Sequence, residues 1–177
     1  MIVVINPREW SNIATMMCDH GRYRLGDKKW SDVMGSDIHP SIEAWEEYAD
    51  KQRIIWLPLY LYDHSGITMA TTPFSCPWDS GRVGFIFVTR EDVIKEYGSF
   101  RKTAQAKAIK RMRQEVEIYD QYLRGAVWVY IIKDQDGDVH ESCGGMYGED
   151  YCRKEGENML ASIKNRISKI TSSFAII

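Results

Sequence analysis

The sequence predicts an α+β fold, in which an antiparallel or mixed β-sheet of hairpins has helices packed on one face. Two observations support this fold class. Some segments alternate between apolar and polar residues or are continuously apolar, as strands are, whereas others repeat apolar residues at steps of three and four, as helices do. The predicted strands come in neighbouring pairs joined by short turns, which indicates hairpins. The 177 residues fit a single domain over 1–177, long enough to bury roughly 70% of its unfolded surface.

The N-terminal segment is expected to contain a short strand, a short helix and a loop. The apolar run Ile2–Ile5 predicts the strand, and Asn6-Pro7-Arg8 ends it. Apolar residues within Ser11–His20 predict the helix. Residues 21–38 are rich in Gly, Asp, Lys and Ser, and we expect a loop there.

A helix and a strand are predicted next. Residues 40–52 form an amphipathic helix, because Pro40 is favourable at a first helical position and apolar residues follow at helical spacing. Residues 55–62 alternate between two faces, as a strand does. Pro58 has no N–H to donate, so we expect a sheet edge or a bulge at this position.

Residues 63–66 have the sequence Asp-His-Ser-Gly, which predicts a turn. Ile67–Thr71 is expected to return from that turn as a paired strand. Val83–Val88 is almost entirely apolar, which is typical of a central strand with neighbours on both sides.

Two helices follow the central strand. Thr89 is a good N-cap and has Asp92 three residues later, so a short helix is expected from there to Tyr97, with Gly98 ending it. Residues 102–123 are the longest predicted helix. Its apolar residues recur at steps of three and four: Ile109, Met112, Val116, Tyr119 and Leu123.

The C-terminal part predicts a hairpin and a final helix. Ala126–Lys133 is a strand, Asp136-Gly137 is a hairpin turn, and Val139–Cys143 is the return strand. A helix over 149–170 completes the chain, and Gly156 is a candidate interruption. The residues that this helix is expected to bury are Met159, Leu160, Ile163, Ile167 and Ile170.

Composition narrows the function classes. The net charge is −2, from 23 Lys plus Arg and 25 Asp plus Glu. A generic nucleic-acid binder is usually basic, and a mimic of the DNA backbone needs a large acidic excess, so neither class is favoured. Apolar runs stay well short of the ~18 residues of a membrane span, and the short run at Met1–Asn6 does not predict a signal peptide. We therefore expect a cytoplasmic protein of a bacterial host cell, with reduced thiols and no membrane partner.

The segment 63–81 is dense in reactive side chains. If the chain is an enzyme, Cys76 is the candidate nucleophile, His64 its base, and Asp79 the residue that orients the imidazole. The alternative is an ordered loop, stiffened by proline and anchored by Trp78 in the core. We favour the ordered loop, because no cysteine-protease signature surrounds Cys76.

A metal site would need ligands from distant parts of the chain. Zinc sites usually show closely paired ligands, and no CxxC pair occurs here. The sequence therefore predicts neither a metal nor a cofactor. The pair considered is Cys18 with His20, and the residues that could complete a tetrahedral set around it are His64, Cys76, Cys143 and Cys152.

The helix predicted over 102–123 begins with a basic stretch at 101–113. No acidic residue precedes Glu115 on it, although cations early in a helix oppose its dipole. The stretch suggests contact with phosphates or with an acidic protein, and the alternative is a solvated face. The candidate partner-binding residues are Lys102, Lys107, Lys110, Arg111 and Arg113, with Trp78 from the loop.

Three groups of segments carry a resemblance to a known family. The first joins PREWSN at 7–12, TMMC at 15–18 and RYRLGD at 22–27; the second joins LYLYDHSG at 59–66 and PFSCPWDSG at 73–81; the third joins EVEIYDQYL at 115–123 and SCGGMYG at 142–148. In this order they resemble a family of small proteins of unassigned biochemistry that phages, prophages and plasmids encode. The resemblance spans most of the chain and brings no established catalytic residue with it.

The resemblance implies a role in overcoming host defence. Accessory proteins of this size without an enzyme signature often inhibit defence systems, and an anti-CRISPR protein that binds a CRISPR nuclease is the sharpest form of this hypothesis. The aromatic loop near Trp78 and the basic helix end would then contact the nuclease. Two alternatives stay open: an enzyme centred on the 63–81 loop, and an accessory protein that binds nucleic acid through the local basic patch on helix 101–113.

Overall fold

The computed structural model describes residues 4–173 of the chain. Contacts define two compact units: a larger unit, Asn6–Arg124, and a smaller unit, Gly125–Ile177 together with Met1–Ile5. The expectation of one domain over 1–177 stays a prediction. None of the helices within the described residues combines the length and apolar character that crossing a membrane requires.

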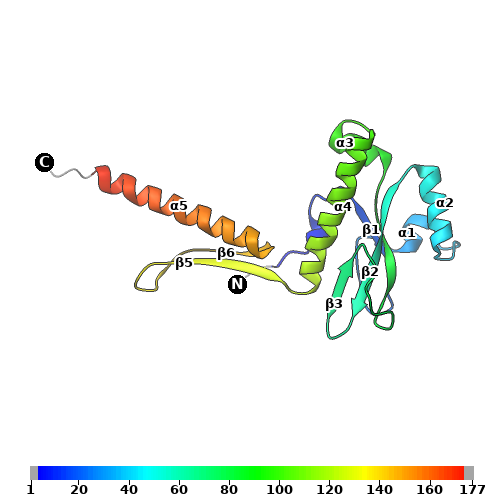
Figure 1. The fold of residues 1–177 in the computed structure, drawn as a ribbon, viewed down its shortest axis with the longest axis horizontal. Coiled ribbons are helices and arrows are strands. Elements are labelled where there is room, and N and C mark those ends of the chain that lie inside the picture. The colour runs from blue at the N-terminus through cyan, green and yellow to red at the C-terminus, as the bar shows by residue number, and fades with distance from the viewer. Residues whose placement is uncertain (1–3, 174–177) are drawn as a thin grey trace. The chain divides into compact units, whose positions relative to one another are not determined.

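The larger unit is built on a four-stranded antiparallel sheet (Figure 1). Its strands are β1 (Thr15–Cys18), β2 (Ile55–Asp63), β3 (Ile67–Ala70) and β4 (Ser80–Val88), in the order β1-β4-β2-β3. The α+β class and the antiparallel pairing are confirmed. Strand β4 lies inside the sheet with a neighbour on each side, as its apolar run predicts.

Helices cover both faces of this sheet. The long helix α4 packs on one face, and α1 and α2 pack on the opposite face (Figure 1). Helices were expected on one face alone; the second face is also covered because β4 carries apolar side chains on both sides. Thr89 caps α3 through a capping box with Asp92, and Gly98 ends it with a φ of 72°. The helices of the unit are the 3-10 helix η1 (Pro7–Glu9), α1 (Trp30–Met34), α2 (Ile42–Gln52), α3 (Arg90–Tyr97) and α4 (Lys102–Leu123).

Two apolar clusters result from this arrangement. On the α4 side, Ile86 and Val88 of β4 pack with Met112, and all three are fully buried. On the other side, Phe85 stacks on the Trp45 ring of α2 at a centroid distance of 5.0 Å. Because successive strand residues point to opposite faces, β4 contributes to both clusters and needs apolar residues throughout.

Pro58 shows how β2 meets both sequence expectations. Strand β3 pairs only with Tyr60–Asp63, so β2 has a free edge at Pro58 on that side. The pairing with β4 also shifts by one residue between Leu59 and Tyr60, which is a bulge. Because β3 does not reach Pro58, no ladder hydrogen bond on that side requires an N–H at this position.

Two N-terminal predictions are wrong. The helix expected over Ser11–His20 is replaced by strand β1, and the loop expected over 21–38 contains the short helix α1. A short apolar run fits the spacing of a helix and of a strand equally well. Here Thr15–Cys18 form a strand because they pair with β4. Of the strand predicted at Ile2–Ile5, residues 2 and 3 lie outside the described residues, and Val4 and Ile5 are not in a strand.

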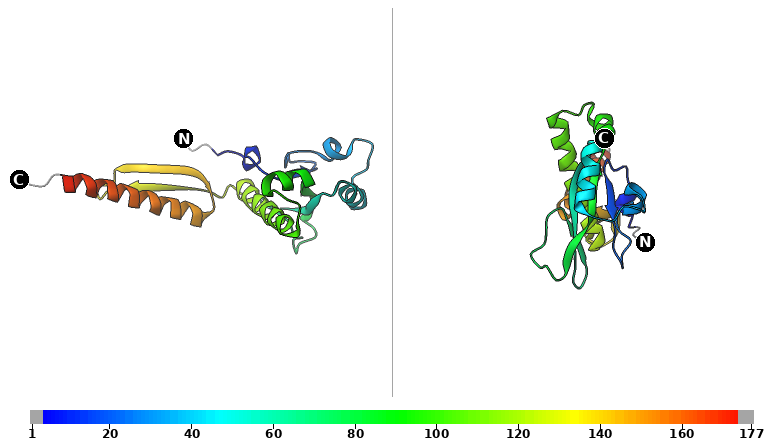
Figure 2. Two further views of the ribbon diagram at one scale, coloured as in Figure 1. Left: turned by 90° about the horizontal axis from the view of Figure 1, so that it is seen from above. Right: turned by 90° about the vertical axis from the view of Figure 1, so that its right-hand side faces the viewer.

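The smaller unit is a hairpin with one helix. Strands β5 (Val127–Lys133) and β6 (Val139–Tyr147) pair antiparallel, and α5 (Glu149–Ser173) lies along them (Figure 2). Gly156 does not interrupt α5. A Cβ built there would lie 3.1 Å from Cβ of Tyr130, so glycine allows the helix to approach the strand closely.

The predicted burial along α5 is wrong in part. Leu160 is 38% exposed and Ile167 is 58% exposed. Met159 and Ile163 are half-buried, and the side chain of Ile170 lies outside the described residues. One hairpin covers too little of a 25-residue helix to bury its apolar residues.

Candidate functional site

The 63–81 loop brings its Cys, His and Asp together around the carboxylate of Asp79. The Cys76 thiol donates to Asp79 Oδ2 at 3.6 Å, and His64 Nδ1 lies 3.4 Å from the same oxygen. Ser80 Oγ donates to the carbonyl of Cys76 at 2.5 Å and fixes the turn. Asp79 is therefore the centre of the cluster.

This geometry differs from that of a thiol nucleophile with its base. Among the described contacts, Cys76 Sγ has none with His64, and its polar contact is an acidic side chain. The His64 side chain is 63% exposed, so solvent also surrounds the imidazole.

An open depression of about 390 Å³ lies next to this loop. Neither His64 nor Cys76 lines it, so a ligand held there would not meet the Cys/His pair. The expected anchoring of Trp78 in the core is wrong, because this side chain is 92% exposed. The polar and aromatic residues that line the depression are Asp19, His20, Arg22, Asp63, Trp78, Asp79, Ser80 and Arg82.

The first three turns of α4 carry an exposed basic face. The N-cap Arg101 makes no side-chain capping hydrogen bond, and the first turn holds no acidic residue. Within the described residues, Arg111 is the one candidate cation with an ion pair, at 3.5 Å from buried Glu115. All five candidate cations are exposed: Lys102, Lys107, Lys110, Arg111 and Arg113.

The candidate partner-binding residues fall into two separate places. Trp78 lies in the loop that precedes β4, and the basic turns of α4 follow α3 at the other end of that strand (Figure 1). Nine residues of β4 separate the two ends. At about 3.3 Å per residue, the two ends are roughly 30 Å apart, so Trp78 and the start of α4 form separate patches.

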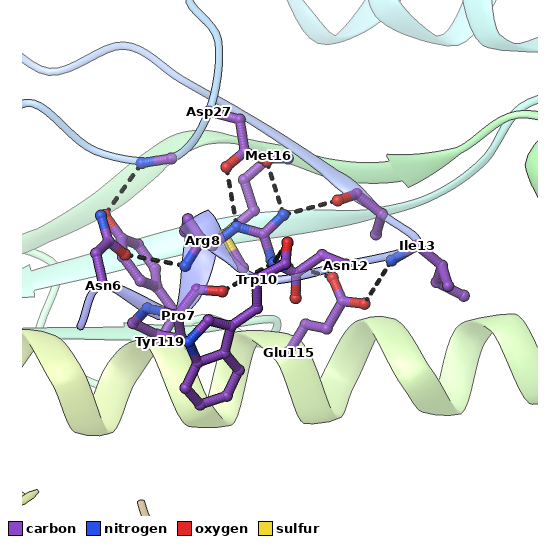
Figure 3. Close-up of polar contacts among 12 residues, drawn as sticks. Asn6, Pro7, Arg8, Trp10, Asn12, Ile13, Met16, Asp27, Glu115 and Tyr119 are labelled. Atoms are coloured by element: carbon purple, nitrogen blue, oxygen red, sulfur yellow. Dashed lines mark hydrogen bonds and ion pairs between the residues drawn. The ribbon is translucent and has the colours of Figure 1, made fainter. Parts of the chain in front are cut away.

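A buried ion triad holds the N-terminal segment on α4 (Figure 3). Arg8 makes a bidentate pair with Asp27, through Nε at 3.0 Å and Nη2 at 2.7 Å, and its Nη1 donates to Glu115 Oε2 at 3.0 Å. The side chains of Arg8 and Glu115 are only 4% and 3% exposed. The second oxygen of Glu115, Oε1, accepts from the N–H of Ile13, and Oδ2 of Asp27 accepts from the N–H of Met16 as well as from Arg8.

The triad explains why charged residues occur at buried positions. Burial alone lowers the pKa of Arg8, but the hydrogen bonds and charges of Asp27 and Glu115 outweigh it and raise the pKa overall. A buried charge is tolerated when its partners satisfy it in this way. Sequence reasoning missed the triad, although Glu115 falls between Met112 and Tyr119 at the spacing of the buried helix face.

Other hydrogen bonds and ion pairs join distant segments of the larger unit in the same manner. Tyr119 Oη accepts from the N–H of Gly26 at 3.1 Å, and Asp120 accepts from the N–H of Met69 at 2.8 Å. Arg22 pairs with Asp63. Many of the motif residues that support the resemblance therefore stabilise the fold of the larger unit.

The cysteines and histidines considered for a metal come from several elements, and His64 and Cys76 meet at Asp79. Cys18 is buried in β1, and burial raises the pKa of its thiol to about 12. Cys143 is exposed on β6, and Cys152 is buried under the hairpin. No group of three His, Cys, Asp or Glu residues within the described part of the chain has an arrangement that fits a metal ion.

The geometry thus offers an exposed basic helix, an exposed tryptophan beside an open depression, and a buried ion triad. Comparison with protein-family models, with curated proteins and with solved structures finds no match to this chain.

Proposed function

We propose that this protein is an anti-defence protein of a mobile genetic element, and that it inhibits a CRISPR nuclease by binding the guide-loaded enzyme. The observation that carries the proposal is the basic face of α4. It presents exposed cations such as Lys107 and Lys110, which have no ion pair among residues 4–173, and the first turn of the helix holds no acid. The sequence resemblance adds the defence context.

The basic face suits a dense array of negative charge. A cation in the first turn of a helix, here Lys102, opposes the dipole at a cost of about 0.3–1 kcal/mol. A partner with regularly spaced phosphates, such as a guide RNA in its nuclease, offsets that cost through charge-assisted contacts. The exposed ring of Trp78 supplies a second contact at the other end of β4, because it offers a large apolar area with a polar tip.

The first experiment measures nuclease inhibition. Guide-loaded CRISPR nucleases of several types are incubated with the full chain, and target cleavage is followed as the chain is titrated. Inhibition that saturates at a fixed molar ratio is expected. Lys110→Glu should weaken it by about tenfold or more, which corresponds to one buried charge contact.

Lys51→Glu is the matched control, because Lys51 lies on α2, on the opposite face of the sheet, and is also exposed. If every nuclease cleaves normally, or if Lys51→Glu weakens inhibition as much as Lys110→Glu, the proposal is wrong.

The same basic face favours a second candidate, a protein that binds free nucleic acid. Contact through four of its cations gives a slope of log affinity against log salt of about −3 to −4. Titration of labelled single- and double-stranded oligonucleotides at several salt concentrations measures this slope. Binding to guide-loaded nuclease without binding to free RNA or DNA excludes this second candidate.

A further inference from the structure

Strand β5 has the sequence of a central strand but occupies an edge. It reads VWVYIIK, with no charge before Lys133, and near-continuous apolar runs are typical of strands covered on both faces. Its sheet contains β6 as its one neighbour among the described residues. Trp128, Val129 and Ile131 are 40%, 40% and 53% exposed. Natural edge strands usually avoid such a surface, because it invites pairing with another strand.

An open groove runs along this strand. It has a volume of about 490 Å³ and lies between β5 and α5. Tyr130 and Ile132 line it from the strand, and Gly156 and Leu160 line it from the helix. Side chains of a strand from a partner that pairs with β5 would contact apolar surface in this groove.

The smaller unit also lacks a core of its own. Between residues 126 and 169, Tyr147 and Cys152 are the buried side chains. A lone two-stranded hairpin is marginally stable in water, and one helix across it adds little when the helix stays largely exposed. The unit needs a further layer or further strands to become stable.

We infer that the smaller unit pairs with a second copy of itself through β5. The two β5 strands run antiparallel and form a continuous sheet in the order β6-β5-β5-β6, with both α5 helices on one face. A twofold arrangement of this kind closes on itself and removes the free apolar edge from both chains. Lys133 stands at the end of β5, so the two copies of this cation lie at opposite ends of the pair.

The charges of α5 favour a copy of the same helix as its neighbour. Residues 149–157 hold four acids and two bases, whereas 158–173 hold three bases and no acid. Two α5 helices on one face of the paired sheet run antiparallel. The acidic first half of each therefore lies beside the basic second half of the other, which is favourable charge complementarity.

Sedimentation of the full chain over a wide concentration range tests this inference. A reversible monomer–dimer equilibrium is expected, with a dissociation constant that rises with salt. Ile131→Lys should raise that constant at least about thirtyfold, because it places a charge in the new pairing. Val139→Lys is the matched control, since Val139 is 58% exposed on β6, which stays an outer strand.

A second variant and a second measurement distinguish a weakened dimer interface from a misfolded chain. Ile131→Thr keeps a β-branched side chain and should weaken the dimer less than Ile131→Lys does, with the same circular dichroism spectrum as the parent chain. Oxidation of Val129→Cys should cross-link two chains, whereas Val139→Cys should not. A chain that stays monomeric at all concentrations, or a dimer that Val139→Lys disrupts as strongly as Ile131→Lys, overturns the inference.

Discussion

The two units of this protein differ in how completely they bury their own apolar residues. In the larger unit, a sheet with helices on both faces buries residues such as Ile86 and Trp45 completely. In the smaller unit, a similar proportion of apolar residues lies on a hairpin and one helix, and Ile131 stays 53% exposed. Apolar sequence therefore predicts burial only where the topology provides a second layer.

Removal of Arg8 should have the largest effect. Arg8→Ala leaves the buried carboxylate of Glu115 with its longer 3.5 Å pair to Arg111 and takes the cation from the partly exposed Asp27, so we expect the free energy of unfolding of the larger unit to fall by about 3 kcal/mol. Chemical denaturation followed by tryptophan fluorescence measures the loss. Arg22→Ala is the control, because this side chain is 71% exposed in its pair with Asp63 and should cost at most about 1 kcal/mol.

A methionine pair compares the two units directly. Met112 of α4 is fully buried, so Met112→Ala should destabilise the larger unit by about 3 kcal/mol. Met159 of α5 is half-buried, and Met159→Ala should cost below about 1 kcal/mol. Hydrogen exchange resolved by element reports the protection of α4 and α5 separately. Equal losses at the two positions would mean that the smaller unit has a core as tight as the larger one.

Glycine substitutions sharpen the same comparison. A Cβ on Gly84 would lie 1.8 Å from the carbonyl oxygen of Met17, so Gly84→Ala must separate β1 from β4 and should cost about 2–3 kcal/mol. On Gly156 a Cβ would meet the Tyr130 side chain at 3.1 Å, and the gain in helix propensity of about 1 kcal/mol offsets this crowding. Gly156→Ala should therefore change thermal unfolding little. Gly81→Ala, with open space around its Cβ, is the control on β4.

The smallest expected effect is a difference in thiol labelling rate between one cysteine of each unit. Cys18 and Cys152 are both 4% exposed, and burial raises the pKa of each thiol. Cys18 should react with a thiol reagent only through global unfolding, whereas Cys152 should react faster, through local opening of α5 from the hairpin. Mass spectrometry of partly labelled chains measures both rates, and a slower reaction at Cys152 would contradict the comparison.

The pKa of Cys18 also gives a pH dependence. Its folded-state pKa is about 12 and its ordinary value is 9.0. Above the ordinary value the unfolded chain loses this proton while the folded chain keeps it, so stability falls as the pH rises through this interval. Cys18→Ala should remove this contribution to the alkaline loss in denaturation curves measured across the interval.

The sequence by itself determined the local structure wherever a single residue or a long pattern is decisive. Thr89 and Gly98 bound α3, Pro58 marks the free edge and the bulge of β2, and the spacing over 102–123 gives α4 its ends. These features depend on backbone geometry and on side chains close in sequence, so no distant partner is needed to predict them. The exposed cations of α4 follow from the same helical pattern.

Only the tertiary structure decided the rest. Strand β1 forms because β4 pairs with it, and Trp78 is exposed because no element covers its loop. Arg8, Asp27 and Glu115 meet from segments far apart in the chain, so their charges looked like ordinary surface charges in the sequence. Burial and ion pairing depend on which elements pack together, and local spacing carries no information about that choice.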